Sequence, residues 1–209
     1  MNFIGFTEVV NTFCEWLMKL AFLNTLWVIF TLAGAGIFGW APATAALFGV
    51  LRKRMLTNED FPTLKTFFSL YKKEFFRANL IGLFILIGGW SLYYSLSTLI
   101  FLEQTAMILL GTIFFIMTIL FVIVSLFIFP VFSHYNIPFK KCFRYSLMLG
   151  LSHLHYCLLM VIALSVTAIL FHSFPGFLLF YAISIPVACV MVITMRVFTS
   201  LEDKVDLKV

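Results

Sequence analysis

The chain has 209 residues, of which 63% are hydrophobic and only 11% are charged, and its formal net charge is +5. A soluble domain of this size needs a much larger charged surface, so the composition excludes an ordinary soluble protein and indicates a polytopic membrane protein. The positive charge does not indicate a nucleic-acid partner, because the basic residues are few and lie beside apolar stretches, where they face lipid headgroups. We therefore expect membrane lipids as partners, and no nucleic acid.

The first 56 residues combine a surface helix with a long uncharged segment. Residues 1–19 place apolar side chains at helical spacing, which predicts an interfacial helix. Residues 20–51 carry no charge and would span about 48 Å as one helix, too long for one crossing and too short for two. A break is expected between Gly34 and Pro42. Residues 20–56 then form either a helical hairpin, which we favour and which places the N-terminus in the cytoplasm, or one long span with an external N-terminus.

The second half of this segment is rich in small residues. Small side chains let the backbones of membrane helices approach closely, so we interpret the run as a helix-packing motif. A leucine in the middle of the run would prevent that approach. The motif consists of Pro42, Ala43, Thr44, Ala45, Ala46 and Gly49.

Residues 61–77 alternate aromatic and basic side chains at helical spacing, which predicts an amphipathic helix on the cytoplasmic surface. This helix has two interpretations: a collar that braces the bundle, or a docking surface for a partner. Its candidate partner or lipid contacts are Lys65, Phe68, Lys72, Lys73 and Arg77.

Four further spans are expected at 79–101, 105–133, 154–172 and 176–198, followed by a tail at 199–209. The turns inside each pair of spans lack Lys and Arg, whereas 52–77, 140–144 and the tail are basic. Because positive residues near spans stay inside, the basic regions and the C-terminus are predicted to be cytoplasmic. The fold class is therefore an all-α transmembrane bundle with five or six membrane helices and cytoplasmic amphipathic helices.

A short motif recurs with an offset of 76 residues, each time before an outward-running helix. The recurrence predicts an internal duplication, of the kind that frames a central cavity in many transporters. Coincidence among Phe-rich basic connectors is the other interpretation. The matching residues are Pro62, Lys65 and Phe67 in the first copy and Pro138, Lys141 and Phe143 in the second.

The most polar strip within a predicted span runs from Asn79 to Thr98. Such residues commonly hold helices together by hydrogen bonds, and the alternative is the lining of a polar cavity. The candidate cavity residues are Asn79, Ser91, Tyr94, Ser95 and Thr98.

No catalytic signature occurs in the sequence: it lacks a phosphate-binding GxxxxGK[ST] loop, an HExxH motif, a GxSxG motif and a pair of carboxylates placed for acid–base catalysis. His153 and His155 come closest to a metal pair, but side chains two positions apart on a helix point about 200° from each other. We therefore expect no enzyme activity, no cofactor and no metal site.

The block Gly39-Trp40-Ala41-Pro42-Ala43-Thr44-Ala45-Ala46-Leu47-Phe48, followed by a basic connector and Phe67-Phe68, resembles the YesL-like family of bacterial membrane proteins, a family of unknown function. The resemblance extends over essentially the whole chain and implies a multi-pass protein of the bacterial cell membrane. Such proteins are often encoded beside sugar-importing ABC transporters and carbohydrate-degrading enzymes, and the family supplies no catalytic residue.

Two functional hypotheses follow. The first is a non-enzymatic accessory protein that assembles with the permease subunits of a carbohydrate ABC transporter through its basic, aromatic helices. The alternative is a small carrier or channel for a neutral solute, alone or as a homo-oligomer, because no charge within a span is present to couple transport to an ion gradient.

Overall fold

The computed structural model describes residues 3–57, 61–99, 104–135 and 137–206, and these residues form helices and connecting turns without a strand. The elements are α1 (Phe3–Ala33), α2 (Trp40–Leu56), α3 (Thr63–Thr98), α4 (Gln104–His134), α5 (Phe139–Ser152), α6 (Leu154–Ser173), α7 (Gly176–Tyr181) and α8 (Ser184–Asp206).

Helix α1 is continuous from Phe3 to Ala33, so the predicted boundary at residue 20 is not a helix end. No proline or glycine occurs in α1 after Gly5, and nothing in the backbone chemistry therefore interrupts it. The chain turns after Ala33 through two residues with positive φ, Ala35 at 59° and Gly36 at 71°. Helix α2 then begins at Trp40, inside the segment where a break is expected.

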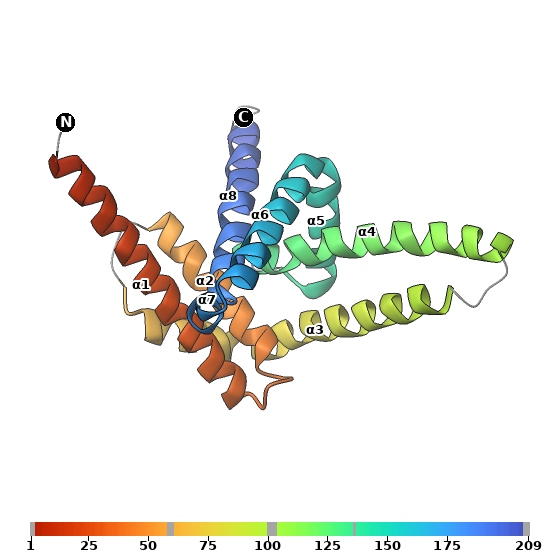
Figure 1. Cartoon of the computed structure of the whole chain (residues 1–209), viewed down its shortest axis with the longest axis horizontal. Coiled ribbons are helices and arrows are strands. Elements are labelled where there is room, and N and C mark those ends of the chain that lie inside the picture. Colours follow the sequence, from red (N-terminus) through yellow and green to blue (C-terminus); the bar gives the residue numbers. More distant parts are fainter. Residues whose placement is uncertain (1–2, 58–60, 100–103, 136, 207–209) are drawn as a thin grey trace.

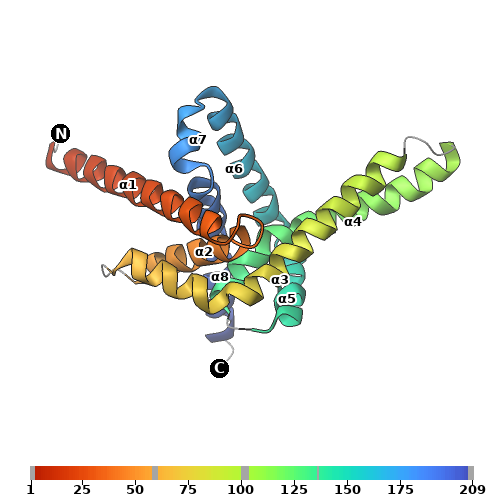
Figure 2. The ribbon, with the colours of Figure 1, turned by 90° about the horizontal axis from the view of Figure 1, so that it is seen from below.

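A glycine is required at position 39, where the turn meets the end of α1. A Cβ atom built on Gly39 would overlap the backbone of Thr31. The close approach lets α2 reverse direction beneath α1, as Figure 2 shows. Whether this hairpin crosses the membrane twice stays a prediction, because α2 is not among the helices whose length and composition qualify them to span it.

Helix α3 joins two segments that the sequence separates. The amphipathic helix expected at 61–77 and the span expected at 79–101 form one helix of 36 residues, about 54 Å long at 1.5 Å per residue. It begins directly after Pro62, and no proline occurs within it. The basic residues of the connector therefore extend rigidly from the membrane-spanning part.

Helices α4 and α6 have the bounds expected for spans, within one or two residues. Between them, the basic connector forms a helix of 14 residues, α5, which starts directly after Pro138. Pro62 and Pro138 thus both precede helix starts, as N-cap residues with extended backbone. This correspondence is local, and the duplication remains a prediction.

The segment 176–198, expected as one span, is not one continuous helix, because the chain forms the short helix α7 and then α8. Asn24 of α1 stabilises the break: its amide oxygen accepts hydrogen bonds from the backbone N–H groups of Ile183 and Ser184, at 3.1 and 3.4 Å. Its amide nitrogen donates to the carbonyl of Leu179 at 3.2 Å. One buried side chain from another helix therefore satisfies the backbone groups that the interruption exposes.

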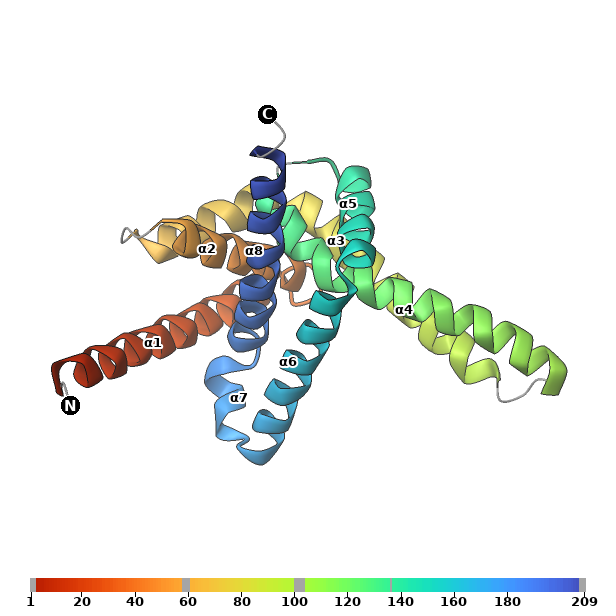
Figure 3. The ribbon, with the colours of Figure 1, turned by 90° about the horizontal axis from the view of Figure 1, so that it is seen from above.

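The helices diverge from one packed centre. In Figure 1, α3 and α4 extend together to the right while the start of α1 lies at the left. Figure 3 shows α6 and α7 projecting in a third direction. The core lies where α2, the first half of α3, the second half of α4 and α8 meet. Four helices, α1, α3, α4 and α6, are long and apolar enough over their described residues to cross a membrane.

Candidate functional site

The first three turns of α3 carry most of the predicted contact residues on the outside of the molecule. Lys65, Phe68 and Lys72 are exposed and recur every three or four residues, so they share one face of the helix. Phe76 extends the same face one turn further and is 83% exposed. We call Phe68, Lys72 and Phe76 the α3 face. Lys73 lies beside it with its side chain 64% exposed.

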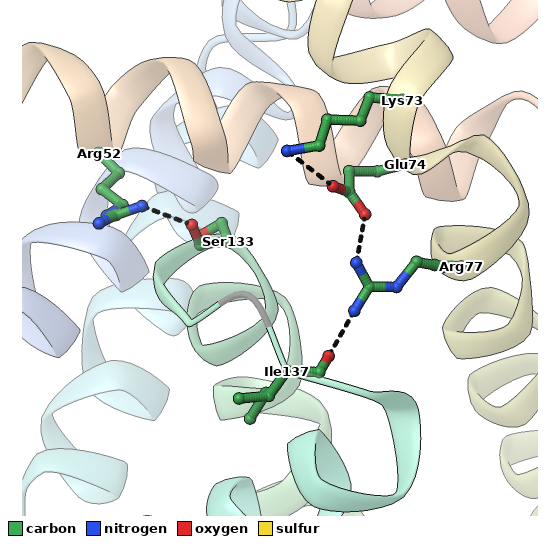
Figure 4. A network of polar contacts seen from close by, with 6 residues as sticks. All are labelled: Arg52, Lys73, Glu74, Arg77, Ser133 and Ile137. Carbon is green, nitrogen blue, oxygen red and sulfur yellow. Dashed lines mark hydrogen bonds and ion pairs between the residues drawn. The ribbon is translucent and has the colours of Figure 1, made fainter.

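Arg77, the fifth predicted contact, is instead a structural residue. Its guanidinium pairs with Glu74 at 3.2 Å and donates a hydrogen bond to the carbonyl of Ile137 at 2.5 Å, as Figure 4 shows. Lys73 lies 3.8 Å from the other oxygen of Glu74. The network ties α3 to the connector between α4 and α5. Arg77 is therefore not a free contact for a partner.

A second arginine connects α2 to the end of α4. Arg52 of α2 donates a hydrogen bond to the carbonyl of Ser133 at 3.0 Å, in the last turn of α4 (Figure 4). The C-terminal end of a helix carries a partial negative charge, so a guanidinium is well placed there. Arg52 therefore holds the last turn of α4, and Arg77 holds the connector that follows it.

A cavity of about 560 Å³ with basic and hydroxyl-bearing lining residues opens beside Arg52, between the end of α2 and the start of α3. Its cations are Arg52, Lys53 and Lys65, and no acid lines it within the described part of the chain. The nitrogen of Lys53 lies 4.5 Å from the centre of the Phe61 ring, which orients the lysine. The other lining residues are Gly49, Leu56, Thr57, Thr66, Ser69, Leu70 and Ser133. We call this the α2–α3 cavity.

The strip predicted to line a cavity does not enclose one. Asn79 and Thr98 donate hydrogen bonds to carbonyls of their own helix, and the Tyr94 side chain is 64% exposed. Ser91 and Tyr94 line one open depression of about 640 Å³ on α3, whereas Asn79 lines a different one and Ser95 lies one turn before Leu99. The five side chains therefore do not converge on one solute.

The helix-packing motif lies at the centre of the molecule. Ala43, Ala45, Ala46 and the neighbouring Pro42 and Thr44 are buried. A Cβ atom on Gly49 would lie 2.8 Å from a methyl group of Leu70 on α3. The hydroxyl of Thr44 accepts a hydrogen bond from the indole of Trp27 at 3.0 Å.

The sequence interpretation missed Asn24, which is 2% exposed and links α1 to α7 and α8. The available signal was its position as a lone amide within an apolar segment. A polar side chain there must find partners, which identifies it as a contact between helices without naming the other helix.

His153 and His155, the two histidines closest to a metal-binding pair in the sequence, lie near each other where α5 meets α6. His153 lies at the junction of α5 and α6, and its ring centre is 6.2 Å from that of His155. Within the residues that the structure describes, no group of three or more His, Cys, Asp or Glu side chains could hold a metal ion.

Comparison with known proteins gives relatives without an assigned activity. The profile of the family described as "Protein of unknown function, DUF624" matches residues 20–96. Uncharacterized protein YteU of Bacillus subtilis (strain 168) is 37% identical over 91% of this chain and 86% of its own length. YesL and YesV of the same organism, also uncharacterized, are each 32% identical, over 93% and 94% of this chain and 92% and 94% of their own lengths. No solved structure matches significantly.

Proposed function

The chain belongs to the DUF624 family, and we propose that it is a non-enzymatic accessory membrane protein that docks a second membrane protein through the α3 face. The observation that carries the proposal is the exposure of aromatic side chains near basic residues: Phe68 is 53% and Phe76 is 83% exposed. Aromatic residues are enriched at protein interfaces, where they supply buried area.

The poor coverage of the long helices supports the same proposal. Only 11% of the apolar window of α3 and of α4 is buried within the molecule. A helix that leaves its bundle has room for lipid or for helices of another protein along its length. Because α3 is continuous, a partner can contact its apolar part and the α3 face together.

The proposed partner is the permease subunit of a carbohydrate-importing ABC transporter, the association that the family resemblance implies. A permease offers both surfaces that the docking needs: spanning helices for the apolar part of α3 and cytoplasmic segments for its basic start. The proposal places the α3 face in the cytoplasm.

The orientation is tested by cysteine labelling in a background without native cysteines. Lys72→Cys is expected to resist a membrane-impermeant maleimide in intact cells and to react after permeabilisation. Ile37→Cys, in the turn between α1 and α2 and 69% exposed in the native side chain, is expected to react from outside. Labelling of Lys72→Cys in intact cells would contradict a cytoplasmic docking face.

The docking itself is tested by affinity purification in mild detergent from the protein's own host, grown on a plant polysaccharide. We expect a permease subunit in near-equal amount from the native protein and a loss of at least about tenfold from Lys72→Glu/Lys73→Glu. The matched control is Lys140→Glu/Lys141→Glu, which reverses two exposed charges on α5. Equal recovery from both variants, or a monodisperse protein without a partner, would contradict the proposal.

The carrier hypothesis has less support, because the strip from Asn79 to Thr98 does not enclose a cavity. Uptake of neutral sugars by liposomes that contain only this protein would revive it. The absence of such uptake is the result expected for an accessory protein.

A further inference from the structure

The α2–α3 cavity combines three features of an anion site. It is lined by three cationic side chains, Arg52, Lys53 and Lys65, without an acid among its described lining residues. Four residues with hydroxyl groups, Thr57, Thr66, Ser69 and Ser133, also line it. Its volume of about 560 Å³ falls within the range of roughly 300–1,000 Å³ that is usual for small-ligand sites.

Two of the three cations are oriented by contacts within the fold. Arg52 is oriented by its hydrogen bond to the Ser133 carbonyl, and Lys53 by the Phe61 ring. Lys65 lies in the first turn of α3, a helix that begins at Thr63 without a side-chain cap. The N-terminal end of a helix carries a partial positive charge, so α3 adds to the field of the three cations.

This arrangement suits a phosphate group better than a carboxylate. A carboxylate carries one charge on two oxygens, whereas a phosphate offers three acceptor oxygens and up to two charges, which several cations and hydroxyls are able to satisfy together. Leu56 and Leu70 provide an apolar wall beside the polar groups. Basic pockets beside spanning helices bind phospholipid headgroups in other membrane proteins.

We propose that the α2–α3 cavity binds a phosphate-bearing ligand through Arg52, Lys53 and Lys65, with Thr66 and Ser69 as hydroxyl donors. The chemistry is shared by an anionic lipid headgroup and a soluble phosphorylated molecule. The site borders the α3 face through Lys65 but includes none of Phe68, Lys72 and Phe76, and it does not depend on the proposed docking function.

The test uses the full-length protein, delipidated in mild detergent, with phosphatidylglycerol, phosphatidylcholine, sodium phosphate and sodium acetate as probes. The readouts are the thermal unfolding midpoint and lipid retention in native mass spectrometry. We expect a phosphate-bearing anion to raise the midpoint and acetate to have no effect. A shift with phosphatidylglycerol alone identifies a lipid headgroup as the source, and a shift with millimolar phosphate identifies a soluble ligand.

Matched variants separate the cavity from general surface charge. Lys53→Gln/Lys65→Gln removes two cavity cations and should weaken the apparent affinity at least about tenfold. Lys72→Gln/Lys73→Gln removes two exposed lysines of the same helical region and should change it by less than about twofold. Thr66→Ala/Ser69→Ala keeps every charge and should weaken it about threefold to tenfold, which provides a test even if the first variant fails to fold.

Equal weakening in the two lysine pairs would overturn the proposal, because it would show attraction to the surface as a whole. The absence of any midpoint shift with phosphatidylglycerol or phosphate would overturn it as well. A loss of partner docking in Lys72→Gln/Lys73→Gln with phosphate affinity retained would separate the two proposals experimentally.

Discussion

The packed centre and the outer halves of α3 and α4 are built from the same apolar helices but are held in different ways. We call residues 83–98 and 105–122 the arm; none of these residues is buried. In the arm, the side chains of Ser97, Thr98, Thr112 and Thr118 donate hydrogen bonds to carbonyls of their own helix. At the centre, side-chain hydrogen bonds connect different helices.

Those central contacts link nearly every element to another. Trp27 joins α1 to α2, Arg52 joins α2 to α4, and the Tyr71 hydroxyl donates to the carbonyl of Phe30 at 3.1 Å, joining α3 to α1. In an apolar environment a polar group must find a partner, and a partner on another helix fixes the crossing. The contacts at the centre therefore determine how the helices cross. The described residues of the arm lack such hydrogen bonds between helices, so its conformation depends on the helix propensity of its residues and on its surroundings.

The largest expected effect comes from filling a contact at the centre. A Cβ atom on Gly82 of α3 would lie 2.5 Å from the Cβ atom of Ala41 on α2. Gly82→Leu should therefore force the two helices apart and cost about 3 kcal/mol, measured as a lower thermal midpoint in detergent. The matched control is Gly89→Leu in the arm, where a Cβ atom would meet only Phe121, at 3.8 Å. The control should change stability by less than about 1 kcal/mol, and equal losses would show that the arm is packed too.

A smaller but still large effect is expected at Asn24. Asn24→Leu removes three hydrogen bonds and leaves the backbone groups of Leu179, Ile183 and Ser184 without that partner. The expected cost is about 2 kcal/mol in thermal unfolding, near the middle of the range for unsatisfied buried groups. Asn79→Leu is the control, because Asn79 bonds only to the Phe75 carbonyl of its own helix and should change stability by about 0.5 kcal/mol or less.

The contrast between contacts within one segment and contacts between distant segments explains which features the sequence predicted. The all-helical membrane character and the extents of α4 and α6 follow from apolar length, a property of each segment alone. The break between α7 and α8 was missed because it depends on Asn24, which lies about 160 residues earlier in the chain. Local patterns carry no information on such a partner.

The features of the candidate site also fall into two groups: those that follow from local sequence patterns and those that depend on tertiary contacts. The exposure of Lys65, Phe68 and Lys72 follows from helical periodicity within one segment. Arg77 was assigned to the same surface because its charge fits the pattern, but its carbonyl partner at Ile137 is a tertiary contact. The α2–α3 cavity was not predicted either, since its cations come from two helices whose crossing depends on the small residues of α2.

Arg77 should give a moderate effect at the edge of the centre. Arg77→Gln removes the ion pair with Glu74 and the charged hydrogen bond to Ile137. The guanidinium is 39% exposed, so solvent screening reduces its contribution, and we expect a loss of about 1 kcal/mol in thermal unfolding. Lys73→Gln, at the outer end of the same network, should have no measurable effect. An equally large loss of stability in Lys73→Gln would indicate that the contacts of Glu74 stabilise the protein, rather than the hydrogen bond between Arg77 and the Ile137 carbonyl.

Cys142 of α5 should have the smallest effect on stability. Its reactivity nevertheless tests how closely the centre is packed. Burial raises the pKa of its thiol to about 12, although Ser146 and the charge of Arg77 lower it in part. Since the thiol is held neutral in the folded protein, its contribution to stability is complete below its ordinary pKa of about 9 and is lost as the pH rises toward 12. With Cys142 as the only cysteine, alkylation by iodoacetamide should stay slow up to about pH 10 and become fast after denaturation, because the thiolate is the reactive form.

A cysteine in the arm provides the contrast for this measurement. Ser91→Cys in a background without native cysteines places a thiol on an exposed position of α3. We expect N-ethylmaleimide, which enters detergent micelles, to label it in the folded protein while Cys142 stays protected. Rapid labelling of Cys142 in the native state would mean that α5 separates from Ile128 of α4, whose carbonyl accepts from the thiol at 3.5 Å. The packed centre would then end at α4, and α5 with its basic residues would belong to the mobile surface of the protein.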